Sequence, residues 1–583
     1  MRFGAMSFAA LAAVVSLTAA CGRMEKSSRA RPGDGAVIYP ASVITMDPAR
    51  PTATAVAVKD GKILAVGDID DLVESYSGAE VDETFGRMTM LPGLIDPHVH
   101  MTLSSLMYAA ETIAPWPIDV AGDGVFYPDR ISFLARLADV EAAAPPGTPL
   151  VVWGYHDLVH GPLARADLDA VTATRPLIVW HYSGHDFYLN SRATEWAKIT
   201  GDLRKTYEGV AVDAKGEPTG RVFEDAVPYL MRSLGPVLLD PARVKRGLEA
   251  FSRRLNEAGV TTVADLGYGL LGLPFEDANI AGNWVSPAHS GYRVYLVPEH
   301  RAFAAAFKEK AVETVLKMAS GETPTPAPVL PQVKFFADGA YYSQTMRVSD
   351  PGYLAGQSTG SKGLWVTPPH AIAETIRPYW DAGLGVRIHS NGDAAQDATL
   401  DALQSLRATS ADRRFVIEHA GLFSPDEARR AGVLGAAVSA ASHYVYYLGE
   451  AYQEPLGPER GQQISPLASL SAAGVKVSLH SDAPLAPPAP LRAASVHLTR
   501  ATREGGVLTP AERLSPKEAL EAITIDAAYA LGLEAEIGSI APGKRADLTI
   551  LERNPLATAG GEWSAIPVWG VVLGGEKRPA RRD

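Results

Sequence analysis

Between about residues 91 and 535, short apolar runs alternate with longer amphipathic stretches. Eight of the runs are expected to be strands of one sheet: LPGLIDPHVH, LIVWHYSG, VTTVADLG, VKFFADG, GVRIHSNG, RFVIEHAG, GAAVSAAS and VKVSLHSD. A further run, LVVWGY, is set aside as an accessory strand, and residues 183–239 are expected to form loops or an insertion over the mouth. Strands that alternate with helices favour parallel βα units. The pattern predicts an α/β fold, a (β/α)8 TIM-type barrel over residues 91–535.

Several amphipathic stretches carry explicit helix start signals. Asp240 precedes a proline and is expected to cap a helix. Ser424 with Glu427, and Ser515 with Glu518, have the spacing of capping boxes with proline at the first helical position. These signals predict helices that begin between the apolar runs, as parallel βα units require.

The two ends of the chain share a different pattern, in which short β-rich runs are separated by turn signals. The runs include AVIYPASVITM and ATAVAVKDGKILAVG before residue 90, and GSIAPGKRADLTIL and PVWGVVLGGEKR after residue 536. Short runs joined by turns such as Lys59-Asp60-Gly61 are typical of antiparallel hairpins. Residues 35–90 and 536–583 are therefore expected to combine into one small β-domain, with the barrel inserted between its halves.

Residues 1–21 are interpreted as an export signal rather than a membrane helix, because the apolar run after Arg2 is too short to span a bilayer comfortably. The stretch LTAAC, ending at the only cysteine, resembles the lipobox of bacterial lipoproteins. We therefore expect an exported lipoprotein of the bacterial cell envelope, anchored to the membrane on the periplasmic side by acylation of Cys21, with residues 22–34 as a flexible tether. The alternative is a plain signal peptide cut after an Ala-x-Ala-like site.

Composition narrows the classes of function. The 583 residues are 46% hydrophobic and 21% charged, which is typical of a globular protein with a large core. The formal net charge is -12 and the interior of the chain has no basic run, so we expect no nucleic-acid partner. A small-molecule substrate is the expected partner, and the sequence leaves homo-oligomer formation open.

Candidate chemistry begins with His98 and His100 at the end of the first predicted strand. In a β-strand, residues two apart point to the same face, so both imidazoles can bind one metal ion. The alternative is an ordinary strand end with two packed or half-exposed histidines, which has roughly equal weight for an isolated pair. The other predicted strand ends decide between the two interpretations.

Those later strand ends carry Lys334, His389, His419 and Asp482, in that order. Because the carboxyl ends of barrel strands meet at one face, we expect these side chains to surround one mouth together with the histidine pair. Nitrogen and oxygen ligands of these types suit zinc, manganese or iron. The metal-binding interpretation of the histidine pair is therefore much the stronger.

The sequence resembles the amidohydrolase superfamily in the order His-x-His, Lys, His, His, Asp and in the closing GSIAPGKRADLTIL. More narrowly, LPGLIDPHVHM, KFFADGA, HSNGDAAQDATLDAL, IEHAG and SDAPLAPPAPLRA resemble its YtcJ-like branch. The resemblance covers nearly everything after residue 34. It implies that the β-domain built from both chain ends is a small β-sandwich.

The resemblance also implies a ligand set: for a first metal ion, His98, His100 and Asp482, and for a second, His389 and His419. Lys334, carboxylated by carbon dioxide, would bridge the two ions, since it then supplies an anion where an ammonium would repel them. The alternative is an uncarboxylated Lys334 paired with Asp338 or another acid, in which case one metal suffices. The expected cofactor is one or two divalent ions, with zinc as the first choice.

The implied function is hydrolysis of a C–N bond of the amide, N-acyl or N-formyl type. Metal-activated water attacks a carbonyl that a metal or a nearby imidazole polarises. Asp482 accepts the proton of the water and returns it to the leaving amine, so it is both ligand and general base and acid. Alternatives are a metal-dependent deaminase or esterase/lactonase on the same barrel, and a non-catalytic, lipid-anchored binding protein.

Three further residues are weaker candidates. His480 stands where the branch commonly has glycine, and it would share the strand face of Asp482, narrowing the substrate pocket or supporting a ligand; a packed histidine is an equal alternative. His185, in HYSGHDFYLNS, is a catalytic candidate that would touch the substrate carbonyl, against a structural hydrogen bond in its loop. Glu224 is a candidate to line the pocket, although an exposed or capping role is favoured.

Overall fold

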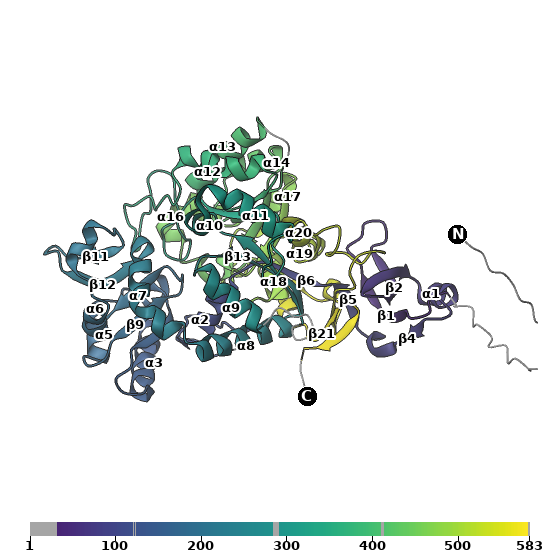
Figure 1. The fold of residues 1–583 in the computed structure, drawn as a ribbon, viewed down its shortest axis with the longest axis horizontal. Coiled ribbons are helices and arrows are strands. Elements are labelled where there is room, and N and C mark those ends of the chain that lie inside the picture. Colours follow the sequence, from purple (N-terminus) through teal and green to yellow (C-terminus); the bar gives the residue numbers. More distant parts are fainter. Residues whose placement is uncertain (1–31, 121, 123, 284–290, 410–412, 581–583) are drawn as a thin grey trace, which may run out of the picture.

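The computed structural model describes residues 32–580 except 121, 123, 284–290 and 410–412. Within these residues the chain forms a mixed α/β fold, with the sheet of the two chain ends at one side of the view and the blue segment of β9, β11 and β12 at the other (Figure 1). Cys21 lies outside the described residues, so export and acylation stay predictions. Among the helices that the structure describes, none is long and apolar enough to cross a membrane.

The two chain ends meet in one sheet, as expected. Its strands, in the order β22-β21-β20-β5-β1-β2-β3 with β4 beside β1, are β1 (Val37–Ile44), β2 (Thr52–Lys59), β3 (Lys62–Gly67), β4 (Glu80–Val81), β5 (Thr89–Pro92), β20 (Leu548–Leu551), β21 (Val568–Leu573) and β22 (Glu576–Pro579). The ends join where β5 and β20 pair antiparallel, with Met90 opposite Ile550. These two side chains are buried together with Val56 and Val572. The described strands of this part form a single sheet, and the sandwich stays a prediction.

Parallel strands fill the middle of the chain, in sheets of three and five strands. The first sheet has the order β14-β13-β6, and its strands are β6 (Leu94–Val99), β13 (Val260–Tyr268) and β14 (Arg293–Pro298). The second has sequential order, and its strands are β15 (Gln332–Phe336), β16 (Gly385–Ser390), β17 (Phe415–His419), β18 (Ala437–Ala441) and β19 (Lys476–His480). Isolated parallel bridges join their edges: Val99 pairs with Ala483, just after β19, and Glu299, just after β14, pairs with Lys334. Every residue of β6 and β13 is buried, as in parallel strands that are covered on both faces.

One predicted strand of the barrel is wrong. The run LIVWHYSG forms β9, which pairs with the accessory strand β8 and not with the parallel strands that carry the candidate ligands. The run RVYLVP, which is absent from the eight predicted strands, forms β14 and takes its place beside β13. The accessory sheet, ordered β11-β12-β10-β9-β8-β7, consists of β7 (Glu111–Thr112), β8 (Leu150–Tyr155), β9 (Leu177–His181), β10 (Asp186–Leu189), β11 (Val210–Val212) and β12 (Pro218–Phe223). Because β7 and β8 belong to this accessory sheet, the inserted segment begins well before residue 183, where the sequence predicts its start. A short buried run has the same composition in either sheet, so the pattern alone could not assign it.

The helix start signals are confirmed. Asp240 caps α8, and reciprocal capping boxes open α14 at Ser424 and α19 at Ser515. The α-helices of the described residues are α1 (Ile69–Ser75), α2 (Met101–Tyr108), α3 (Arg130–Ala143), α4 (Asp157–His160), α5 (Arg165–Val171), α6 (Ser191–Trp196), α7 (Val227–Leu238), α8 (Pro241–Glu257), α9 (Leu273–Asn283), α10 (His300–Phe307), α11 (Ala311–Ala319), α12 (Pro369–Asp381), α13 (Asp393–Arg407), α14 (Pro425–Val433), α15 (Tyr444–Leu448), α16 (Gln453–Arg460), α17 (Leu467–Ala472), α18 (Pro490–Thr499), α19 (Pro516–Ala522) and α20 (Ile525–Leu531). The helices α12, α13 and α14 each lie between two consecutive strands of the five-stranded sheet, so they supply its parallel crossovers.

Candidate active site

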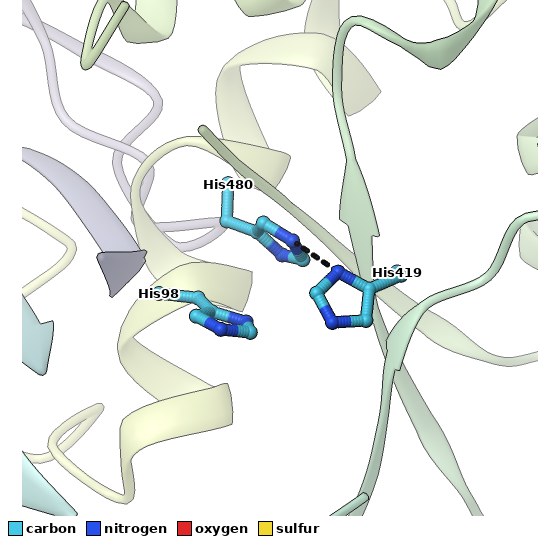
Figure 2. Close-up of side chains that lie close together, drawn as sticks. All are labelled: His98, His419 and His480. Atoms are coloured by element: carbon cyan, nitrogen blue, oxygen red, sulfur yellow. Dashed lines mark hydrogen bonds between the residues drawn. The ribbon is translucent and has the colours of Figure 1, made fainter. Parts of the chain in front are cut away.

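The candidate ligands lie at the carboxyl ends of the parallel strands. His98 is in β6 and His100 follows it, Lys334 is in β15, His389 in β16, His419 ends β17, His480 ends β19, and Asp482 follows two residues later. Figure 2 shows the imidazoles of His98, His419 and His480 converging from three of these strands. The structure thus brings together side chains that are nearly 400 residues apart in the chain.

His98, His100 and Asp482 form one group whose ligand atoms all lie within 4.8 Å of one another. Oδ1 of Asp482 is 3.4 Å from Nε2 of His98 and 3.2 Å from Nε2 of His100. This Oδ1 is buried and has no hydrogen-bond partner among the described residues. A buried acceptor that faces two imidazole nitrogens without such a bond fits a cation held between them.

A second group consists of His98, His419 and His480, again within 4.8 Å. Nε2 of His480 is 3.2 Å from Nδ1 of His419 (Figure 2). Nδ1 of His480 is 2.8 Å from Oγ of Ser439. His480 is buried, and its ring lies within hydrogen-bond distance of the candidate ligand His419. A residue that only narrowed the substrate pocket would lie farther from the ligands.

His389 lies beside this group, with its ring centroid 4.4 Å from that of His419. Its Nε2, however, is 3.0 Å from the carbonyl oxygen of Gly339 and 3.0 Å from Nδ2 of Asn391. The joint binding of one metal by His389 and His419 therefore stays a prediction.

Lys334 is buried with its Nζ 3.4 Å from Nε2 of His98. Asp338, the partner considered for an uncarboxylated lysine, instead accepts hydrogen bonds from the backbone N–H groups of Arg347, Asn391 and Gly392 at 2.8–2.9 Å. Burial lowers the pKa of Lys334 to about 8. At pH 7 about one tenth of this amine is therefore uncharged, which is far more than at an ordinary lysine pKa.

Burial also keeps most of the imidazoles neutral. It lowers the pKa of His389 and of His480 to about 3, and it holds the pKa values of His98 and His419 well below their ordinary value. A neutral imidazole is the form that binds a metal. These histidines are therefore ready to act as ligands without losing a proton.

His100 and Asp482 behave differently. Burial would lower the pKa of His100, but the carboxylates of Asp265 and Asp482 outweigh it and raise this pKa to about 9. Burial would raise the pKa of Asp482, but the neighbouring His100 outweighs it and lowers this pKa to about 2. The pair thus carries opposite charges when no cation lies between its members.

The sequence interpretation missed the carboxylate that orients His98. Nδ1 of His98 is 2.8 Å from Oε2 of Glu418, whose other oxygen is bound by the buried guanidinium of Arg387. Such a contact fixes the tautomer of a metal-binding histidine and leaves Nε2 free for the metal. Asp96 plays a related part, accepting hydrogen bonds from the N–H and hydroxyl of Ser481 at 3.1 and 2.5 Å and so linking β6 to β19. The sequence signal for the Arg387–Glu418 pair is one charged residue in each of two otherwise apolar runs, Arg387 in VRIH and Glu418 in VIEH.

His185 and Glu224 contact each other in the accessory segment. Nδ1 of His185 is 3.2 Å from Oε2 of Glu224, and Thr345, in the loop after β15, donates to Oε1 of Glu224 at 3.4 Å. Glu224 is therefore neither a free surface residue nor only a helix cap. The contact ties the accessory sheet to a loop that follows the strand of Lys334.

Three candidate residues have a left-handed backbone conformation that side chains other than glycine rarely adopt: His419 (φ 75°), Asp482 (φ 54°) and Glu224 (φ 45°). Such strain persists only where the surrounding structure imposes it, and it concentrates at functional sites. The backbone therefore marks two candidate ligands and the partner of His185 independently of their residue types.

Histidines and an aspartate gathered at the carboxyl ends of parallel strands are features of an α/β enzyme. The model of the amidohydrolase family matches residues 86–577, which is most of the chain, and the protein therefore belongs to this family.

Known proteins agree with this assignment. The chain is 26% identical to the putative amidohydrolase YtcJ of Bacillus subtilis (strain 168) over 536 residues, 90% of this chain and 95% of the relative, which supports the YtcJ-like branch. It is also 26% identical to an N-substituted formamide deformylase of Arthrobacter pascens over 560 residues, 94% of this chain and 98% of that protein. The crystal structure of an uncharacterized metal-dependent hydrolase from Pyrococcus horikoshii OT3 matches with a TM-score of 0.66 and 19% identity, covering 90% of this chain and 99% of that one, and this similarity shows a shared fold.

Proposed function

We propose that this protein is a metal-dependent hydrolase that cleaves a C–N bond of the amide, N-acyl or N-formyl type. The observation that carries the proposal is the buried Oδ1 of Asp482, which makes no hydrogen bond among the described residues and lies within 3.4 Å of Nε2 of both His98 and His100. The family membership supports a hydrolase, and the formamide-cleaving relative supports this bond type. We further propose that the two parallel sheets, which touch at both edges, work as one closed eight-stranded barrel.

The proposed metal centre holds one or two divalent ions, with zinc as the first choice. His98, His100 and Asp482 would hold one ion, and His419, with His389 or His480, would hold another. A bound cation of this kind lowers the pKa of water and polarises a carbonyl group. Glu418 would keep the ring of His98 oriented, because its carboxylate lies against Nδ1.

Asp482 is the proposed proton carrier. The neighbouring His100 holds its carboxyl ionised at neutral pH, despite burial, so it can accept a proton from the attacking water. The same carboxyl would then return that proton to the leaving nitrogen. Its second oxygen, Oδ2, is 3.7 Å from Nδ1 of His419, which keeps the carboxylate between the two groups of histidines.

Lys334 is proposed to be carboxylated. The supports are its buried, partly uncharged amine, its position 3.4 Å from Nε2 of His98, and the engagement of Asp338 by other groups. An uncharged amine is the form that adds to carbon dioxide. The resulting anion would suit a position between two cations better than an ammonium does.

The test of the proposed function is metal removal. Protein freed of metal by a chelator is expected to lose at least about 99% of its amine release from N-substituted formamides and amides, and added zinc is expected to restore it, because the metal supplies the nucleophile. Matched esters and aminopurines belong in the same assay. If metal-loaded protein prefers those substrates, or if turnover is unaffected by the chelator, the proposed bond type or the proposed chemistry is wrong.

The contact between His185 and Glu224 predicts a pH effect. Burial would lower the pKa of His185, but the Glu224 carboxylate outweighs it and raises this pKa above its ordinary value. If protonated His185 binds the substrate carbonyl, activity is lost as the pH rises through this raised pKa. In Glu224→Gln the raising charge is gone, so the alkaline fall of kcat/KM is expected at lower pH. The exposed Glu217→Gln is the matched control, and an unchanged alkaline limb in Glu224→Gln would count against the role of His185.

A further inference from the structure

A small cavity borders His100. It has a volume of about 110 Å³. Its lining combines the apolar side chains of Leu103, Leu270, Leu271 and Phe336 with the polar side chains of His100, Thr102, Asp265 and Glu276. Leu103 comes from α2, the two other leucines come from the turn after β13, and Phe336 ends β15. A larger groove of about 490 Å³ beside α12 and α13 contains none of the candidate ligands.

The cavity adjoins the candidate metal centre on two sides. His100, one of its walls, has Nε2 3.2 Å from Oδ1 of Asp482. Phe336, another lining residue, has its ring centroid 5.2 Å from that of His389 and 5.1 Å from Nζ of Lys334. A group that fills the cavity is therefore attached to a part of the substrate that lies next to Asp482.

The two carboxylates that line the cavity are already engaged. Asp265 accepts hydrogen bonds from the N–H groups of Met101 and Gly267 at 3.0 Å. Glu276 accepts from the N–H groups of Gly269 and Leu271 at 2.5 and 2.6 Å. Both carboxylates hold the local backbone. The three leucines, Phe336 and the hydroxyl of Thr102, which has no hydrogen-bond partner among the described residues, are left to contact an occupant.

The size of the cavity limits its occupant. A cavity of roughly 150 Å³ lined by aliphatic side chains holds a benzene ring, and this one is smaller at about 110 Å³. Glycine at position 267 keeps it open, since a Cβ there would come within 2.8 Å of both Nδ1 of His100 and Cδ1 of Leu270. A short aliphatic chain fits these limits better than an aromatic ring.

We propose that this cavity binds the aliphatic group on the leaving nitrogen of the substrate, a chain of three to five carbons. The proposal rests on the proposed function, because Asp482 protonates that nitrogen and His100 joins Asp482 to the cavity wall. Leu103 and Leu271 are then specificity-determining residues. Each methylene that enters an apolar cavity improves binding by about 0.8 kcal/mol, or about fourfold in Kd.

The test uses zinc-loaded protein and N-alkyl-N-hydroxyformamides, which chelate metal and carry their alkyl group on nitrogen. Calorimetry is expected to show that Kd falls about fourfold per methylene from methyl to butyl and stops falling beyond pentyl. In Leu103→Trp, the ratio of the methyl to the butyl Kd is expected to drop at least tenfold. In Leu103→Ala the plateau is expected to move to longer chains. Val433→Trp, at an exposed position outside the cavity, is the control and should leave the series unchanged.

The same protein is assayed for hydrolysis of N-alkylformamides, which separates the two proposals. A chain-length series that responds to the Leu103 variants, without hydrolysis of any formamide, upholds the cavity and overturns the proposed reaction. Hydrolysis with a flat series, or with Leu103 variants that behave like Val433→Trp, overturns the cavity and upholds the reaction. Absence of chelator binding to protein of confirmed zinc content overturns the cavity as well, because the zinc and the cavity adjoin the same histidine.

Discussion

Replacing His98 with alanine is expected to lower kcat/KM for the hydrolysed amide by at least about a thousandfold, equivalent to about 4 kcal/mol of transition-state stabilisation. His98 belongs to both groups of candidate metal ligands, the one with His100 and Asp482 and the one with His419 and His480. Its loss therefore weakens every metal position that the cluster offers. Bound zinc per chain, measured by elemental analysis after gel filtration, should fall together with the rate.

The matched control for His98→Ala is another fully buried histidine outside the cluster. His497 hydrogen-bonds the carbonyl of Ser442 at 3.0 Å and belongs to neither group. His497→Gln should keep the metal content of the natural protein. If His98→Ala retained both its zinc and its rate while unfolding at the same temperature as His497→Gln, the proposed centre would be wrong.

Most of the candidate site could be predicted from the sequence, because its signal is local. His98 and His100 stand two residues apart at the end of an apolar run, and parallel strands bring such ends to one face. The structure places His419 and Asp482 close to this pair, and His389 lies beside His419. Which atoms bind which metal ion depends on side-chain directions that no spacing encodes.

The strand that was assigned wrongly shows where the same argument fails. LIVWH and RVYLVP are both short, apolar and bounded by polar residues, so periodicity gives them equal standing. Their partners differ, because β9 pairs with β8 and β14 pairs with β13. Pairing is a long-range property, and it decides which run contributes to the site.

The buried supports of the site were also beyond the sequence. Glu418 immediately precedes His419 in β17, yet its carboxylate orients His98, which is 320 residues away. The cavity beside His100 likewise combines α2, the turn after β13 and the end of β15. Residues adjacent on a strand point to opposite sides, so a motif centred on His419 gives no direct indication of what Glu418 contacts.

Replacing Arg387 with methionine is expected to lower the free energy of unfolding of the metal-free protein by about 3–5 kcal/mol. The Arg387 and Glu418 side chains are both fully buried, and removing the guanidinium leaves a carboxylate without its cation in the interior. Urea denaturation measures the loss. Arg192→Met, which breaks the exposed pair with Glu195, should change stability by no more than about 0.5 kcal/mol.

The double variant Arg387→Met/Glu418→Leu separates the structural role of this pair from its role at the metal centre. With both charges gone, most of the stability lost in Arg387→Met should return, since apolar side chains need no partner. Nδ1 of His98 would now lack its acceptor, so metal affinity, measured by competition with a chelator, should be about 10–100-fold weaker than in the natural protein. If affinity returned together with stability, Glu418 would be a packing residue, and the orientation of His98 would have to come from the strand itself.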